Sequence, residues 1–168
     1  MKLNEVVQTD LEKLLTEYNI TDYSIRNDGL VDVNGHVELN YKNFTKLPIN
    51  FGHVAGNFSC AYCHNLQSLE GVPTSIDGNF SCYNCDKIKS LDYLPKQITG
   101  MIFLGLTSKV KDVFKIFKIK GIKYLYFDDT RKLKKLEKII NKYLPKRDML
   151  NCQDELIEAG FEEYAEVE

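Results

Sequence analysis

The chain has 168 residues, of which 43% are hydrophobic, and a formal net charge of -2. A chain of this length and apolar content can bury a core without metals or disulfides, which excludes a disordered protein and a disulfide-dependent miniature scaffold. Because the sequence has neither a signal-peptide pattern nor 18 consecutive uncharged apolar residues, we expect a soluble cytoplasmic protein whose five cysteines are thiols or ligands.

The first predicted elements are a helix and a group of short strands. Apolar residues at steps of three and four predict a helix over residues 5–19 with one apolar face. Between residues 23 and 40 the pattern changes to alternation, interrupted by Asn27-Asp28-Gly29 and Asn34-Gly35. Asn-Gly between alternating runs is a strong hairpin signal, so two or three short strands are predicted to close one end of the repeats that follow.

A tandem repeat occupies the middle of the chain. The sequence Gly-Asn-Phe-Ser-Cys begins at Gly56 and again at Gly78, and glycines recur at 35, 56, 78, 100 and 121. A period of 21 to 22 residues, each with a short β-rich segment, predicts a solenoid with a parallel sheet in which equivalent residues stack. Three core ladders are predicted: Val37, Phe58, Phe80, Ile102; Leu39, Cys60, Cys82, Leu104; and Phe44, Leu66, Ile88. After Gly100 the register leaves open whether Ile102 and Leu104 or Met101 and Phe103 face inward.

The repeats carry a resemblance to a known class of solenoid. Residues 58–69 and 80–91 resemble the leucine-rich-repeat signature, apolar-x-apolar-x-x-(Asn or Cys)-x-apolar, with Cys63 and Cys85 at the Asn/Cys position. Lys42 occupies that position in the first copy and departs from the pattern, so we expect an irregular turn there.

The sequence of residues 56–73 resembles, more specifically, degenerate leucine-rich-repeat-like proteins encoded by large tailed bacteriophages. The similarity extends to residues 142–145 and 152–161. It implies a solenoid fold and a viral setting, and it implies no activity.

Helices are predicted beyond the repeats. The apolar pattern indicates helices over 108–118 and 130–143 on either side of a strand at 124–127, and Pro145 ends the second helix. An acidic helix follows at 150–167, anchored by Leu156, Ile157, Phe161 and Tyr164 and weakened by Gly160. We therefore predict one α/β domain, residues 1–168, built as a short leucine-rich-repeat-like solenoid. Its parts are an N-terminal helix and hairpin cap (1–34), the repeats (35–127) and a C-terminal helical cap (128–168).

Charge is segregated along the chain. Residues 1–108 carry a net charge of -4, residues 109–147 carry +10 and residues 148–168 carry -8. The basic block, with Tyr124, Tyr126 and Phe127 nearby, has the composition of a nucleic-acid-binding surface, lysines on phosphates and rings on bases. The alternative, which we favour, is that the acidic tail neutralises the basic helices within one fold.

The cysteine pairs allow two interpretations. Cys60-x-x-Cys63 and Cys82-x-x-Cys85 match the spacing of a four-cysteine zinc site. Leucines fill the equivalent position of Cys60 and Cys82 in the flanking copies, however, which indicates a packed ladder of small apolar residues. We favour the ladder and predict neither metal nor cofactor, with zinc at these four cysteines as the alternative.

No catalytic motif is present, so we predict no enzyme, no catalytic residue and no small-molecule substrate. His64 adjoins Cys63 but has no third group to orient it as a base.

The predicted outer face of the sheet holds the partner-binding candidates Glu38, Ser59, Ser81, Tyr83 and Phe103. The expected function is a non-catalytic protein-interaction module, a phage accessory protein acting on a host or phage protein, without membrane contact. The alternative is a nucleic-acid-associated regulator of host transcription that uses the basic helices of 109–147, with or without a structural zinc.

Overall fold

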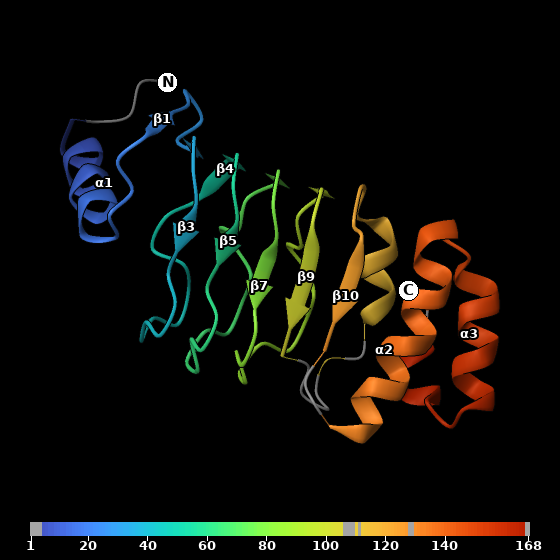
Figure 1. Cartoon of the computed structure of the whole chain (residues 1–168). Helices are drawn as coiled ribbons and strands as arrows, with labels where there is room; N and C mark the ends of the chain where they lie inside the picture. The colour runs from blue at the N-terminus through green and yellow to red at the C-terminus, as the bar shows by residue number, and fades with distance from the viewer. Residues whose placement is uncertain (1–4, 106–109, 111, 128–129, 167–168) are drawn as a thin grey trace.

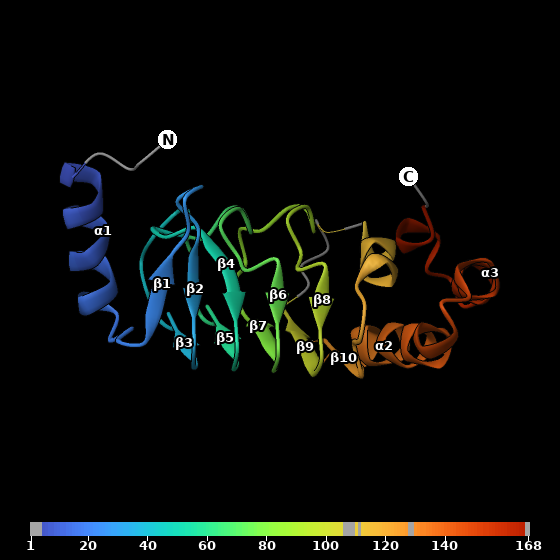
Figure 2. The same cartoon turned by 90° about the horizontal axis from the view of Figure 1, so that it is seen from above.

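The computed structural model describes residues 5–105, 110, 112–127 and 130–166, with side chains from residue 8 onward. The predicted α/β solenoid is confirmed: short strands stack coil upon coil into two five-stranded sheets, and helices lie at both ends (Figure 1). Seen from above, the two sheets form two layers, with helix α1 (Glu5–Glu17) at one end and helices α2 (Arg131–Tyr143) and α3 (Met149–Glu158) at the other (Figure 2).

Each coil gives one strand to each sheet. Sheet A contains, in spatial order, β1 (Tyr23–Ile25), β2 (Val31–Val33), β4 (Phe51–Val54), β6 (Ser75–Ile76) and β8 (Gln97–Ile98). Sheet B contains β3 (Val37–Glu38), β5 (Phe58–Ser59), β7 (Phe80–Cys82), β9 (Met101–Leu104) and β10 (Tyr124–Tyr126). Apart from the antiparallel pair β1–β2, neighbouring strands in both sheets run parallel.

Sheet B is the parallel sheet expected from the repeat, and its register is the predicted one. Val37 pairs with Phe58, Phe58 with Phe80 and Phe80 with Ile102, and all four side chains are fully buried. Cys82 pairs with Leu104, so Ile102 and Leu104 face the core and the open question of register after Gly100 is settled. The Phe58 and Phe80 rings stack 6.1 Å apart. Burying a phenylalanine contributes about 2–3 kcal/mol, so this ladder is a main source of stability.

A second ladder, of polar side chains, joins the coils where the strands of sheet B begin. The Asn79 backbone N–H donates to Asn57 Oδ1 at 2.8 Å, and the Met101 N–H donates to Asn79 Oδ1 at 2.8 Å. In the first coil His36 takes the place of asparagine, and its Nδ1 accepts from the Asn57 N–H at 2.9 Å. Each of the first three coils therefore provides one side-chain acceptor for the backbone of the next.

The glycine before each asparagine permits this close stacking. A Cβ atom on Gly78 would lie 2.7 Å from the carbonyl oxygen of Gly56 and 2.5 Å from Asn57 Oδ1. Contacts below 3.0 Å are too short for a carbon atom, so a side chain cannot enter here unless the coils move apart.

The N-terminal end is partly as predicted. β1 and β2 form a hairpin around Asn27-Asp28-Gly29. The prediction of a hairpin at Asn34-Gly35 is wrong. These residues connect β2 and β3, which belong to different sheets. A two-residue type I′ hairpin needs positive φ at both central residues, and neither Asn34 nor Gly35 has it.

The turn at Lys42 is regular, against the expectation from the leucine-rich-repeat pattern. Tyr41, Tyr62 and Asn84 occupy equivalent positions and have left-handed φ values of 60°, 59° and 55°. The Lys42 ammonium group lies over the Tyr18 ring, 5.3 Å from the ring centroid. The side chain of the Asn/Cys position is therefore not needed for the turn to form.

The C-terminal elements differ from the prediction at their ends. Within the region 108–118, where a helix is expected, a 3-10 helix spans Val113–Lys118. Residues 108, 109 and 111 of that region lie outside the described residues. α2 begins after Thr130, whose hydroxyl accepts from the Leu133 N–H at 3.3 Å, and a 3-10 turn with Pro145 follows at Leu144–Lys146.

The acidic segment is not one continuous helix. α3 ends at Glu158, Gly160 has a φ of 79°, and a 3-10 turn follows at Glu162–Tyr164. Leu156, Phe161 and Tyr164 are buried, but Ile157 is 45% exposed and is not an anchor, because the break at Gly160 changes the face that packs.

α2 covers the β10 edge of sheet B. Asn141 pairs with the backbone of Leu125 as a neighbouring strand would: its Oδ1 accepts from the Leu125 N–H at 2.9 Å, and its Nδ2 donates to the Leu125 carbonyl at 2.7 Å. The buried Glu137 carboxylate accepts from the Phe127 N–H and from the Tyr124 hydroxyl, both at 2.8 Å. Edge strands of this kind otherwise pair with other chains. Within the described residues, no helix has the length and apolar character needed to cross a membrane.

Candidate functional site

Aromatic rings from successive coils lie next to one another along the outer side of sheet B and the turns after its strands. The ring centroids of neighbouring members lie 4.7 to 6.3 Å apart. We call this set the aromatic strip, and its members are Tyr41, Tyr62, Tyr83, Phe103 and Tyr126. The strip crosses all five coils that contribute strands to sheet B.

Backbone geometry places these rings outside the core. Phe103 and Tyr126 pair in register between β9 and β10, and their sequence neighbours Ile102 and Leu125 point inward, so alternation sends both rings outward. Tyr41 and Tyr62 follow their strands in left-handed conformation, and their rings stack at 4.7 Å with an interplanar angle of 7°. Tyr41 is 74% exposed.

A shallow pocket of about 370 Å³ opens within the strip. Its lining is formed by Ala61, Tyr62, Ser81, Tyr83, Phe103 and Tyr126. None of these lining residues is charged, and the small side chains Ala61 and Ser81 lie among four rings. Such a lining suits an apolar or aromatic group, because stacking and burial supply the attraction.

Three of the predicted partner-binding residues, Ser81, Tyr83 and Phe103, meet in this pocket. Ser59 lies one coil away, and its hydroxyl donates to Asn40 Oδ1 at 2.6 Å. Glu38 is exposed and pairs in register with Ser59, so it lies at the far end of the same row of outward residues.

Sequence reasoning missed Tyr41, Tyr62 and Tyr126 as members of the site. A signal existed for the first two, since tyrosine stands at equivalent positions of consecutive repeats. Tyr126 belongs to a coil whose length differs from the earlier ones, and only the pairing of β10 with β9 brings it beside Phe103.

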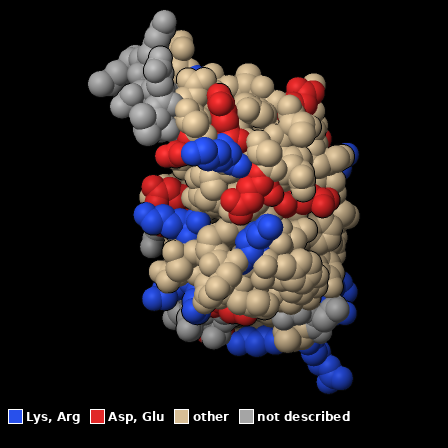
Figure 3. All heavy atoms as spheres, turned by 90° about the vertical axis from the view of Figure 1, so that its left-hand side faces the viewer, with Lys and Arg blue, Asp and Glu red and all other residues tan. Residues whose placement is uncertain are grey.

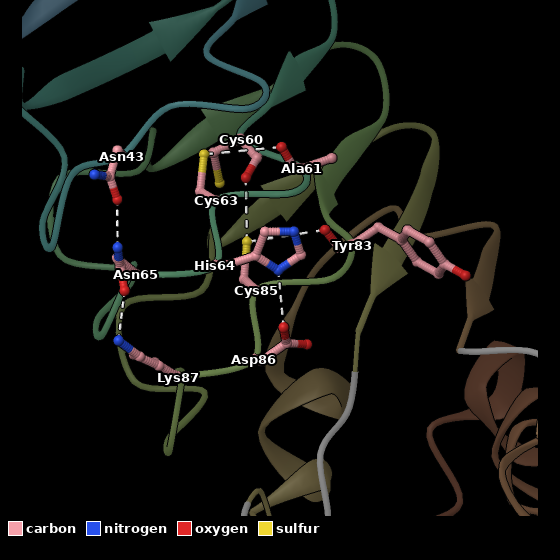
Figure 4. Close-up of polar contacts among 10 residues, drawn as sticks. All are labelled: Asn43, Cys60, Ala61, Cys63, His64, Asn65, Tyr83, Cys85, Asp86 and Lys87. Atoms are coloured by element: carbon pink, nitrogen blue, oxygen red, sulfur yellow. Dashed lines mark hydrogen bonds and ion pairs between the residues drawn. The ribbon is translucent and has the colours of Figure 1, made fainter.

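Cys60, Cys63, Cys82 and Cys85 are buried in the core on two successive coils (Figure 4). The Cys63 thiol donates to the Leu39 carbonyl oxygen, and the Cys85 thiol donates to the Cys60 carbonyl oxygen, each at 3.1 Å. Each thiol thus reaches the preceding coil. All five cysteines are free and buried, and no group of three or more His, Cys, Asp or Glu in the described ranges is arranged to hold a metal ion.

Burial controls the acidity of three of these thiols, whereas a hydrogen bond with Cys60 lowers the pKa of Cys85. Burial raises the pKa of Cys63, raises that of Cys82 well above the ordinary range, and raises that of Cys152 in α3 to about 12. Folding therefore favours the thiol form of Cys63, Cys82 and Cys152, and the thiolate is the reactive form.

This gives a prediction for alkaline solution. An unfolded thiol has a pKa of about 8.5, so the unfolded chain loses the Cys152 proton first as the pH rises. The contribution of the protonated Cys152 thiol to the free energy of unfolding is complete below about pH 8.5 and is lost as the pH approaches 12. We expect Cys152→Val to reduce the fall in urea midpoint between about pH 8.5 and pH 10.5, relative to the wild type. Ile157→Val, on the exposed side of the same helix, is the control, and an unchanged slope in Cys152→Val would contradict the assignment.

His64 is engaged away from the neighbouring cysteine. Its Nδ1 lies 2.8 Å from Asp86 Oδ2 in the next coil, on the exposed side of the turn (Figure 4). Asn43, Asn65 and Lys87 form a parallel row of side-chain hydrogen bonds across three coils. These contacts continue the coil-to-coil pattern at the surface.

Lysines of α2 form ion pairs with the acidic C-terminal segment. Lys132 pairs with Glu163 at 2.7 Å, and Lys142 pairs with Glu155, whose pKa is lowered by that contact and by the Tyr143 hydroxyl. The acidic segment therefore neutralises lysines of α2 within the fold. The end of the molecule that carries α1 shows acidic side chains across its upper middle, with basic side chains among them and along the lower margin (Figure 3).

Comparison of the chain with protein-family models, with curated proteins and with solved structures gave no match.

Proposed function

We propose that the protein is a non-catalytic interaction module that holds another protein on the aromatic strip. The observation that carries the proposal is the continuous row of five rings, four of which line an uncharged pocket. Tyrosine and phenylalanine are enriched at the centres of protein interfaces and charged residues are depleted there. Solenoids also offer extended sheet surfaces to their partners.

The nucleic-acid alternative has less support. Phosphate groups are bound by lysine and arginine, and no such residue lines the pocket. Lys132 and Lys142 of the basic block are paired with the acidic segment, which competes with phosphate for them. The resemblance of residues 56–73 to phage proteins is the sole support for the further proposal that this is a phage accessory protein acting on a host or phage protein.

A triple variant tests the use of the strip. Each substitution introduces the residue that the equivalent position of a neighbouring coil already has, so the fold should be kept: Tyr62→Asn after Asn84, Tyr83→Ala after Ala61 and Phe103→Ser after Ser81. Each ring removed from the centre of the interface is expected to weaken binding by about tenfold or more. The wild type, immobilised, should retain specific proteins from a bacterial lysate at high salt, and the triple variant should not.

Tyr93→Gly is the matched control. Tyr93 is 60% exposed, lies outside the strip and has the left-handed φ that Gly71 adopts in the preceding coil. The control should retain the same proteins as the wild type. Equal retention by the triple variant, with an unchanged circular dichroism spectrum, would overturn the proposed site.

A further inference from the structure

We propose that the occupant of the aromatic strip is a proline-rich segment in polyproline II conformation, lying along the axis of the solenoid. The inference rests on the proposed function, and it adds the chemistry and the conformation of the partner. Three features support it: the spacing of the coils, the chemistry of the pocket and the position of one acidic side chain.

The spacing of the coils matches the polyproline II helix. Adjacent parallel strands lie about 4.8 Å apart, so two coils advance about 9.6 Å along the axis. Three residues of polyproline II, one full turn, advance about 9.3 Å. A segment along the axis therefore presents an equivalent residue to every second coil with little drift. The pocket takes lining residues from four successive coils, a span of about 14 Å, which is the length of four to five such residues.

The chemistry of the pocket favours proline over a strand or a charged segment. Proline offers a flat apolar ring and has no N–H to satisfy, so it can pack against Tyr83 and Phe103 without a polar penalty. The exposed carbonyl groups of polyproline II need donors, and the hydroxyls of Tyr62 and Ser81 stand in the lining. A strand can pair only at an edge of sheet B, and the edge next to Phe103 and Tyr126, β10, is already bonded by Asn141 and Glu137.

One acidic side chain gives the segment a direction. Glu38 is exposed and stands in the row that continues through Ser59 and Ser81 to Phe103, one coil beyond Tyr62. A basic residue at the matching end of the segment would meet this carboxylate. Surface ion pairs of this kind orient a partner more than they strengthen its binding.

The test uses synthetic decapeptides and the full chain. The probes are nine prolines with one arginine at the N-terminus, the same peptide with the arginine at the C-terminus, and a Gly-Ser decapeptide; isothermal titration measures the affinities. We expect both proline peptides to bind and the Gly-Ser peptide not to bind. Tyr83→Ala and Phe103→Ser should each weaken proline binding by about tenfold or more, and Tyr93→Gly should leave it unchanged. Glu38→Gln should abolish the difference between the two arginine peptides and leave their common affinity in place.

The outcomes separate the two proposals. If the proline peptides do not bind while lysate proteins are still held through the strip, the polyproline inference is overturned and the proposed function stands. If the peptides bind the strip variants as well as the wild type, the inference is also overturned. Binding of a β-linked glucose oligosaccharide at the strip, abolished in Tyr83→Ala, with neither proline binding nor retention of lysate proteins, would overturn both.

Discussion

Replacing Gly78 with alanine is expected to lower the free energy of unfolding by about 2–3 kcal/mol, although the change adds a single methyl group at the surface end of a strand. The added Cβ would lie 2.7 Å from the Gly56 carbonyl oxygen in the preceding coil. The backbone of Gly56 and that of Gly78, which would carry the Cβ, are held in place by the parallel pairing of β5 and β7 and by the hydrogen bond from the Asn79 N–H to Asn57 Oδ1. Relief requires the coils to separate, which loosens this bond and the Phe58–Phe80 stack.

Gly35 provides the control for this change. It is the equivalent residue of the first coil, and a Cβ there would have no heavy atom within 4 Å. Gly35→Ala should therefore be neutral or stabilise the protein by a few tenths of a kcal/mol to about 1 kcal/mol, through the smaller entropy of the unfolded chain. Urea denaturation followed by circular dichroism measures both variants. Equal stabilities of Gly35→Ala and Gly78→Ala would show that the close approach of the coils does not limit this position.

Replacing Glu137 with alanine is expected to cost about 3 kcal/mol and to promote self-association. The Phe127 N–H loses its acceptor inside the protein, whereas the Tyr124 hydroxyl, on a side chain that is 38% exposed, can turn to water. A buried N–H group that loses its acceptor lowers the free energy of unfolding by most of its desolvation penalty. Without these two hydrogen bonds α2 docks less firmly on β10, and an uncovered strand edge pairs readily with another chain. Urea denaturation measures the first effect and analytical ultracentrifugation the second.

Two further substitutions identify the cause. Glu137→Gln keeps an oxygen for the Phe127 N–H, and the Tyr124 hydroxyl can reverse to accept from the new amide, so we expect a loss of only about 1 kcal/mol. Lys138→Ala, one residue along on the exposed face of α2, should change stability by less than about 0.5 kcal/mol. The explanation fails if Glu137→Ala costs no more than Lys138→Ala.

Sheet B could be predicted from the sequence because the repeat itself contains its core ladder. Phe58 and Phe80 stand at identical positions and fill identical slots, and Val37 and Ile102 extend the ladder at both ends. Sheet A could not be predicted in the same way. Its strands β6 and β8 have two residues each, with one inward isoleucine, so they are too short for alternation to appear.

The aromatic strip was predictable in part for the same reason. Tyr83 and Phe103 follow from the register of sheet B, because they stand on positions that alternate with buried ones. The stacking of Tyr41 on Tyr62 depends instead on the left-handed backbone of the turn, which asparagine and glycine favour and which a tyrosine does not indicate. The hydrogen bonds of Asn141 and Glu137 with β10 depend on the docking of a helix from outside the repeat, which no local pattern encodes.

The asparagine ladder has an evolutionary consequence. The coil from Asn57 to Gly78 receives a side-chain acceptor, His36 Nδ1, from the coil before and provides one at the equivalent position, Asn57 Oδ1, to the coil after, and its Phe58 ring pairs in register with both neighbouring coils. A duplicated stretch of DNA that encodes these 22 residues would therefore insert a coil whose two faces already fit their neighbours. The middle of the molecule can lengthen or shorten by whole coils through unequal recombination, while the two ends, with their own caps, are inherited unchanged.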